Sequence, residues 1–326
     1  MRKGTLIAVF IAVAVIAILV ASSSMDRPGK DAEDRITVIA SIFPVFDFAR
    51  KVAGERADVY MLLPPCAEAH SYEPKPSDVG LLSEADLFIY TTSSMEPWAP
   101  DMLAGMDSSS LHVLEAGLGA PVSITYEEEH ALHEDGRVED GIESKSGRGV
   151  DPHIWLDIDN SIFMVRAIAS AMAGISPGDA DYFHSNAEAY VERLIALDNS
   201  YKEAIAGCSL RTIIHGGHYA FGYLARRYGL DYRAAQGFSP DSEPGPKQMM
   251  ELIGLMKDTG AKYIFYEELV EPRVADVIAK ETGAGMLMLH AGHNISKGEL
   301  ASGKGFIGLM EDNLEALKVG LGYDGN

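Results

Sequence analysis

The sequence predicts an α/β protein in which two lobes of parallel β-sheet, flanked by helices, are joined by one long rigid helix. Short apolar runs rich in β-branched residues alternate with segments of helical periodicity over residues 35–175, and the same alternation resumes over 208–326. This alternation is typical of parallel sheets covered by helices on both faces. Between the two stretches, residues 176–207 have no glycine or proline from Asp179 to Ala206, which predicts a single helix of about 30 residues.

The first lobe is expected to begin with a strand over Ile36–Ala40. Phe46, Ala49 and Val52 then recur at helical spacing up to Gly54, which predicts a helix that ends there. "ADVYMLLPP" predicts a strand running into a loop, "PSDVGLLSEADLFIYTT" a short helix followed by a strand, and "SLHVLEAG" another strand. The last element of this lobe is an apolar helix from about residue 159 to 175.

The linking helix has recognisable start signals. Ser176 is suited to the N-cap and Pro177 to the first turn. Five residues can share one apolar stripe of this helix: Tyr182, Ala187, Tyr190, Leu194 and Leu197. Beyond it, strands are expected in "RTIIHGGH", "DYRAAQGF", "AKYIFYEE" and "AGMLMLHAG", alternating with helices in "YAFGYLARRYGL", "KQMMELIGLMKDTG", "PRVADVIAKETG" and "FIGLMEDNLEALKVGLG".

Charge and the N-terminal segment constrain partners and location. The formal net charge of -21 argues against nucleic acid, whose phosphates would repel the chain. Residues 1–24 contain two cations, an unbroken apolar run and small residues, the plan of a secretory signal peptide. The run is also close to the roughly 20 residues that a membrane anchor needs. We therefore expect an extracytoplasmic protein, either secreted or tethered to the outer face of the cytoplasmic membrane.

Two further features leave alternatives open. Residues 126–150 are acidic and lack apolar periodicity, which predicts a solvated loop; its His130 and His133 are either simply exposed or capture metal transiently. The chain has two cysteines, Cys66 and Cys208. They are too few for a zinc site made of cysteines alone, and their positions do not establish a disulfide.

Three histidines lie where the predicted strands end. His70 follows a strand, His153 precedes a helix, and His218 lies at a strand-to-helix turn. In open parallel sheets ligands bind beyond the carboxyl ends of the strands, so a cleft between the lobes could bring these three together. Three neutral imidazoles and a fourth ligand suit tetrahedral zinc, whereas carboxylate-rich sites suit manganese. The alternative is that each histidine is a core residue satisfied by backbone groups.

Residues next to these histidines have more modest expected roles. Glu68 is expected either to orient His70 or to replace a ligand, and Asp157 to cap the following helix. His215 is expected to be buried near the site without being a ligand. Phe221 and Tyr223 are expected in the core.

Three ordered segments carry a resemblance to a known family. "LLPPCAEAHSYEPKPSDV", "DPHIWLD" and "HYAFGYLARRYGL" resemble the signature segments of the cluster A-I metal-binding proteins, the solute receptors of zinc and manganese ABC importers. The resemblance extends from Ile36 to Gly322. It implies a receptor that is not an enzyme, that delivers metal to a membrane permease of an ABC transporter, and that we expect to be a monomer.

The resemblance also implies a ligand set. Metal would bind at His70, His153 and His218, and histidine at the third position is typical of zinc-type members, so Zn²⁺ is expected and Mn²⁺ less so. The fourth position falls nearest His290, with His293, Glu267 or a water molecule as alternatives. Cys66 stands where relatives usually carry glycine.

Competing functions remain at this point. A manganese or iron receptor is the nearest rival, and a surface adhesin with a structural metal is another. A secreted zinc-dependent hydrolase would also need three protein ligands, but the chain lacks an H-E-x-x-H helix.

Overall fold

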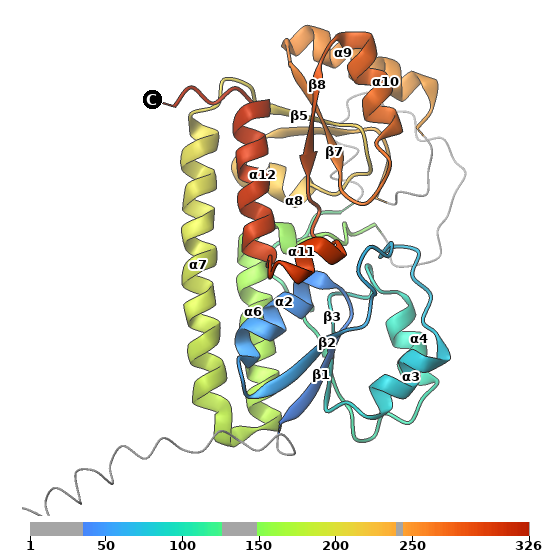
Figure 1. Ribbon diagram of the computed structural model, residues 1–326, viewed down its shortest axis with the longest axis vertical. Coiled ribbons are helices and arrows are strands. Elements are labelled where there is room, and N and C mark those ends of the chain that lie inside the picture. Colours follow the sequence, from blue (N-terminus) through green and yellow to red (C-terminus); the bar gives the residue numbers. More distant parts are fainter. Residues whose placement is uncertain (1–34, 126–148, 239–243, 326) are drawn as a thin grey trace, which may run out of the picture. The chain divides into compact units, whose positions relative to one another are not determined.

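The computed structural model describes residues 35–125, 149–238 and 244–325 (Figure 1). The predicted segment 1–24 and the histidines at 130 and 133 lie outside the described residues. Thr125, directly before the predicted acidic loop, and Val150, its last residue, form an antiparallel bridge.

The N-terminal lobe has a parallel sheet in the order β2-β1-β3-β4. The two central strands are almost wholly buried, whereas the edge strands are partly exposed. In chain order the elements are β1 (Ile36–Ala40), α2 (Phe43–Ala53), β2 (Ala57–Met61), α3 (Pro76–Ser83), β3 (Leu87–Tyr90), α4 (Trp98–Ala104) and β4 (His112–Glu115). Helix α4 is absent from the sequence-based expectation because it is short and contains Pro100; the buried Ala99 anchors it to the sheet.

Helices α6 (Ile158–Ile175) and α7 (Ala180–Ala206) lie side by side, and α7 also packs along α2 and α12 (Figure 1). The carboxylate of Asp157 accepts the Asp159 N–H at 2.8 Å and caps α6, as predicted. By length and composition α6 could cross a membrane, but its packing on α2 and α7 makes it a core helix.

The start of the linking helix differs from expectation. Pro177–Asp179 form a 3-10 turn before α7, and the Ser176 hydroxyl donates to the Asp179 carboxylate at 2.8 Å instead of capping backbone N–H groups. The predicted stripe was wrong at Tyr182, which is 37% exposed, because Phe183 lies at the correct helical spacing from Ala187 and is buried in its place. The other four stripe residues are buried as expected.

The C-terminal lobe has a second parallel sheet in the order β6-β5-β7-β8. Its elements are β5 (Thr212–His215), α8 (Gly222–Tyr228), β6 (Asp231–Ala234), α9 (Pro246–Thr259), β7 (Tyr263–Glu267), α10 (Arg273–Thr282), β8 (Gly285–Leu289), α11 (Lys297–Ala301) and α12 (Phe306–Gly320). Helix α8 begins after the first residues of its predicted segment. Helix α11 was not expected, although Ser296 and Glu299 form the capping box that could have revealed it.

One hydrophobic cluster contains residues of both lobes, including the buried Phe221 and Tyr223. Phe48 of α2 meets Phe306 of α12 edge-on with ring centroids 5.0 Å apart. The Trp155 indole N–H donates to the Ala291 carbonyl at 2.8 Å, again across the lobes. Two lobes are therefore present as predicted, but they share a core, and a domain division at 35–175 and 208–326 stays a prediction.

Candidate metal centre

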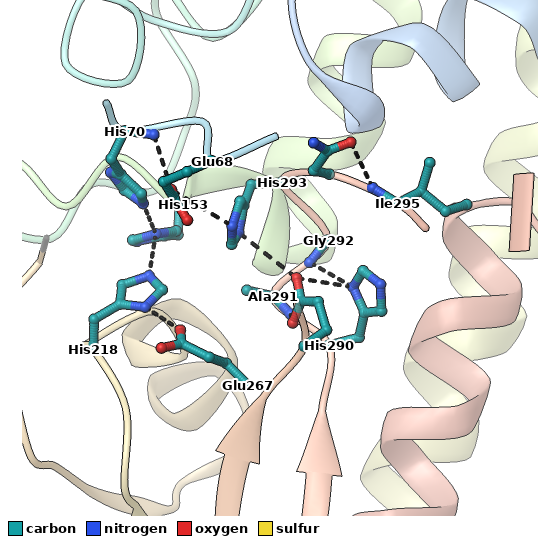
Figure 2. A network of polar contacts seen from close by, with 12 residues as sticks. Glu68, His70, His153, His218, Glu267, His290, Ala291, Gly292, His293 and Ile295 are labelled. Carbon is teal, nitrogen blue, oxygen red and sulfur yellow. Dashed lines mark hydrogen bonds and ion pairs between the residues drawn. The ribbon is translucent and has the colours of Figure 1, made fainter. Parts of the chain in front are cut away.

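The three predicted histidines come together between the lobes (Figure 2). His70 lies in the loop between β2 and α3, His153 lies directly before the 3-10 turn Ile154–Leu156, and His218 lies between β5 and α8. We call these three residues the histidine cluster. One nitrogen from each ring lies within 4.8 Å of the other two, so the cluster could hold a metal ion.

The spacing inside the cluster suits a common ligand. The Nε2 atom of His153 is 3.2 Å from Nε2 of His70 and 3.2 Å from Nε2 of His218. Tetrahedral zinc with Zn–N bonds of about 2.0–2.1 Å separates neighbouring nitrogens by roughly 3.4 Å. The arrangement therefore needs little change to surround one zinc ion.

Carboxylates behind two of the rings set which nitrogen faces the centre. Nδ1 of His153 lies 2.7 Å from Oδ1 of Asp151, which also accepts the His153 backbone N–H at 2.9 Å. Nδ1 of His218 is in close contact with the Glu267 carboxylate. A carboxylate at Nδ1 favours the tautomer with the proton there and leaves the Nε2 lone pair directed at the metal position.

The cluster lies mostly out of contact with solvent, and burial favours the neutral imidazole of His70 and of His153. His153 and His218 are at most 1% exposed, and His70 is half-buried. Burial lowers the pKa of His70 and of His153 well below the ordinary value, and neighbouring histidines lower both pKa values further. Neutral imidazole is the form that binds metal, so these ligands are ready at neutral pH.

The structure places His290 apart from the cluster. It directly follows β8, where the Asn313 side chain of α12 bonds both its backbone N–H and its carbonyl, at 2.7 and 2.8 Å. Its Nδ1 accepts the Gly292 N–H at 3.0 Å and lies 3.2 Å from a Glu268 carboxylate oxygen. Burial lowers the pKa of His290 to about 4.

His293, three residues further on, has the neighbouring position instead (Figure 2). Its ring centroid lies 5.6 Å from that of His70, 5.9 Å from that of His218 and 6.4 Å from that of His153. Its Nδ1 is 3.8 Å from Oε1 of Glu268. His293 thus lies beside the cluster, with a carboxylate on the Nδ1 side at a longer distance than the carboxylates of His153 and His218.

Glu68 and His215, the other residues predicted to lie near the site, contact the main chain of the cluster histidines. Oε1 of Glu68 accepts the His70 backbone N–H at 3.0 Å and lies 4.0 Å from Nε2 of His293, so it holds the His70 main chain. His215 is fully buried beneath His218, with Nδ1 3.2 Å from the His218 carbonyl and from the Tyr232 hydroxyl. Burial lowers the pKa of His215 to about 4.

Two buried carboxylates, Asp151 and Glu268, lie behind the rings. The sequence did not predict this position for either of them, and Glu268 was considered only as a possible base of the hydrolase alternative. Asp151 stands two residues before a predicted ligand, which was its only available signal. In the described part of the chain both cysteines are free thiols, Cys66 exposed and Cys208 buried, so the open question of a disulfide is answered negatively.

Two parallel-sheet lobes enclosing a buried histidine cluster define the class of metal-binding solute receptors. The chain belongs to the family described as zinc-uptake complex component A, periplasmic, whose model matches residues 38–320. This is an extracytoplasmic family of transport components, not of enzymes.

The comparisons identify relatives of known description. The chain is 32% identical over 289 residues to the zinc-binding lipoprotein AdcA of Streptococcus pneumoniae serotype 4, covering 89% of this chain and 56% of AdcA. The chain therefore spans only about half of that relative. It is 31% identical over 312 residues to the high-affinity zinc uptake system protein ZnuA of Bacillus subtilis strain 168, covering 95% and 96% of the two chains.

A solved structure supports the same relationship. The Zn(II)-bound ZnuA-like domain of Streptococcus pneumoniae AdcA superposes with a TM-score of 0.71 at 30% identity, covering 88% of this chain and 99% of that domain.

Proposed function

We propose that this protein is the zinc receptor of an ABC uptake system, which binds Zn²⁺ outside the cytoplasm and delivers it to a membrane permease. The observation that carries the proposal is the convergence of three imidazoles. Nε2 of His153 lies 3.2 Å from Nε2 of His70 and of His218, and carboxylates orient the His153 and His218 rings. The names of the relatives, a zinc uptake protein and zinc-binding lipoproteins, support zinc as the cargo.

The proposed ligands are His70, His153, His218 and His293. His293 takes the fourth place in preference to His290 because its ring lies beside all three cluster rings, whereas His290 is engaged with Gly292 and Glu268. Glu267 is a weaker candidate because its carboxylate lies on the Nδ1 side of His218, behind the ring. A water molecule remains the alternative if His293 does not bind.

A site of this composition favours zinc over manganese. Imidazole nitrogen suits zinc, whereas manganese prefers carboxylate, carbonyl and water oxygens. The carboxylates of Asp151, Glu267 and Glu268 lie behind imidazole rings, where they balance the charge of a divalent ion without being ligands.

Competitive titration of the purified chain with Zn²⁺ and Mn²⁺, beside its His153→Ala variant, tests the proposal. We expect one zinc per chain, little displacement by excess manganese, and loss of tight binding in the variant. Equal affinity for the two metals would favour the manganese receptor, and zinc binding unaffected by the substitution would return His153 to a purely structural role.

We further propose that the receptor is a monomer that residues 1–24 direct out of the cytoplasm, as a cleaved signal or as a retained anchor. The periplasmic description of the family supports this location. Light scattering of the purified chain and the N-terminal mass of the exported protein test the two statements. A stable dimer, or a chain retained in the cytoplasm, would contradict them.

A further inference from the structure

The segment that carries His293 is docked on the N-terminal lobe, although it follows the last strand of the C-terminal lobe. Three alternate carbonyls of this segment, those of Ala291, His293 and Ile295, accept hydrogen bonds from N-terminal donors. The donors are the Trp155 indole at 2.8 Å, the Phe43 N–H at 3.3 Å and the Cys66 N–H at 3.0 Å.

Asn294 adds a side-chain connection to these backbone contacts. It is fully buried, and its Nδ2 donates to the Pro64 carbonyl at 3.0 Å and also to the Ala67 carbonyl. Its Oδ1 accepts the Ile295 N–H at 2.7 Å. The amide nitrogen thus connects the His293 segment to one turn of the His70 loop, while the amide oxygen holds the side chain within its own segment.

The turn held in this way, residues 64–67, has an unfavourable backbone. The Ala67 N–H donates to the Pro64 carbonyl at 3.1 Å, and between them Cys66 has φ of 70°. A residue with a Cβ is disfavoured in this left-handed region, where glycine is the usual choice. The turn therefore needs external contacts to keep its shape, and His70 lies only three residues beyond it.

We propose that Asn294 is a positioning residue that locks the His70 loop to the His293 segment and thereby slows zinc release. The inference rests on the proposed function and deepens it. Without the amide, the Ala67 carbonyl loses its Asn294 donor and the Pro64 carbonyl keeps only the Ala67 N–H. The turn then relaxes, so His70 leaves the metal position more often. The entry of zinc into the site is little affected, because the other rings keep their places.

The test compares Asn294→Ala with Asn313→Ala in the full chain. Asn313 is a matched control because it is also buried and also bonds backbone groups, but those groups belong to His290 and not to the His70 loop. We expect the zinc dissociation rate, measured by stopped-flow transfer to a chelator, to rise about tenfold in Asn294→Ala, the change expected from losing about one well-made hydrogen bond. In Asn313→Ala the dissociation rate should stay within about twofold of wild type. That variant leaves intact the Asn294 bonds to the Pro64 and Ala67 carbonyls, which we call the tether.

A second readout does not need zinc. Hydrogen exchange of the amides of residues 66–70 in the metal-free protein should be faster in Asn294→Ala than in Asn313→Ala. Equal exchange in the two variants, or equal dissociation rates, would overturn the tether. If the wild-type chain itself fails to bind zinc, the proposed function is wrong. The exchange comparison still tests whether Asn294 holds the His70 loop in place.

A third test asks whether glycine at position 66 compensates for the loss of Asn294. Cys66→Gly, placed in the Asn294→Ala background, makes the left-handed turn favourable without external contacts. The dissociation rate should then return part of the way to the wild-type value. A double variant as fast as Asn294→Ala alone would contradict a tether that acts through this turn.

Discussion

The Nε2 atoms of His153 and His218 lie 3.2 Å apart, although the two residues are 65 positions apart in the sequence and belong to different lobes. Each ring has a carboxylate on its Nδ1 side, Asp151 for the first and Glu267 for the second. Both Nε2 atoms are therefore acceptors that face each other. This juxtaposition is unfavourable in an empty site and becomes favourable when a cation lies between them.

Replacing Asp151 by Asn should weaken zinc binding about tenfold to a hundredfold. The amide oxygen can still accept the Nδ1 proton of His153, but the negative charge that raises the basicity of the ring is lost. Competition titration measures the change, with Asp159→Asn as a control, because Asp159 is exposed and pairs with Arg227 outside the cluster. Equal affinities of the two variants would show that the buried charge has no role.

The fourth ligand can be decided by two alanine substitutions three residues apart. His293→Ala should raise the zinc dissociation constant at least about tenfold, a loss of about 1.4 kcal/mol. His290→Ala should change it less than about threefold, because that ring faces Gly292 and Glu268. The reverse order of effects would restore His290 as the ligand.

The metal-free protein should lose stability as the pH falls from about 6.5 toward 4. His215 is fully buried, and burial holds its folded-state pKa at about 4, below the unfolded value of about 6.5. In this pH window the unfolded chain binds a proton at His215 that the folded chain does not bind. The contribution of His215 to the free energy of unfolding is therefore complete above pH 6.5 and is lost as the pH falls toward 4. At pH 5 the loss is about 2 kcal/mol for this residue.

Urea unfolding at several pH values measures whether the free energy of unfolding falls as the pH falls. The His215→Gln variant, which has no titrating group at this position, should show a shallower decline between pH 6.5 and 5 than the wild type. An identical slope would mean that His215 is protonated in the folded state or exposed in it. Burial raises the pKa of Glu96 and of Glu268, which acts in the opposite direction but equally in both proteins.

Arg227 connects three elements close to the site, and lysine should not replace it. Its guanidinium bonds Asp198 of α7 at 2.6 Å and Asp157, the cap of α6, at 3.0 Å. Lysine lacks the planar fork for two partners, so Arg227→Lys should lower the free energy of unfolding by about 1–3 kcal/mol. Arg166→Lys, in the exposed pair with Glu188, should change it by less than about 0.5 kcal/mol. Similar losses in both variants would contradict a special role for the buried network.

Much of this architecture follows from short-range patterns. The alternation of apolar strands with periodic helices predicts both parallel sheets, because each period reflects which face of an element is buried. The same pattern places His70 and His218 beyond strand ends, where parallel sheets leave room for ligands, and His153 directly before a helical turn. Short elements were missed: α4 and α11 have too few turns to show a period, and packing or a capping box stabilises them.

The sequence by itself determined the two lobes and the long helix, and its resemblance to the metal-receptor family indicated the three histidines of the cluster. Only the tertiary structure decided which of two histidines after β8 lies beside them. His290 directly follows β8 and is bonded to Asn313 of α12, whereas the segment with His293 bonds the N-terminal lobe. The carboxylates behind the rings, the Arg227 network and the Asn294 contacts were decided in the same way. Most of these contacts join residues that are tens to hundreds of positions apart in the sequence. The exception is Asp151, whose contact with His153 depends on the local backbone conformation. A periodic sequence pattern does not reveal contacts of either kind.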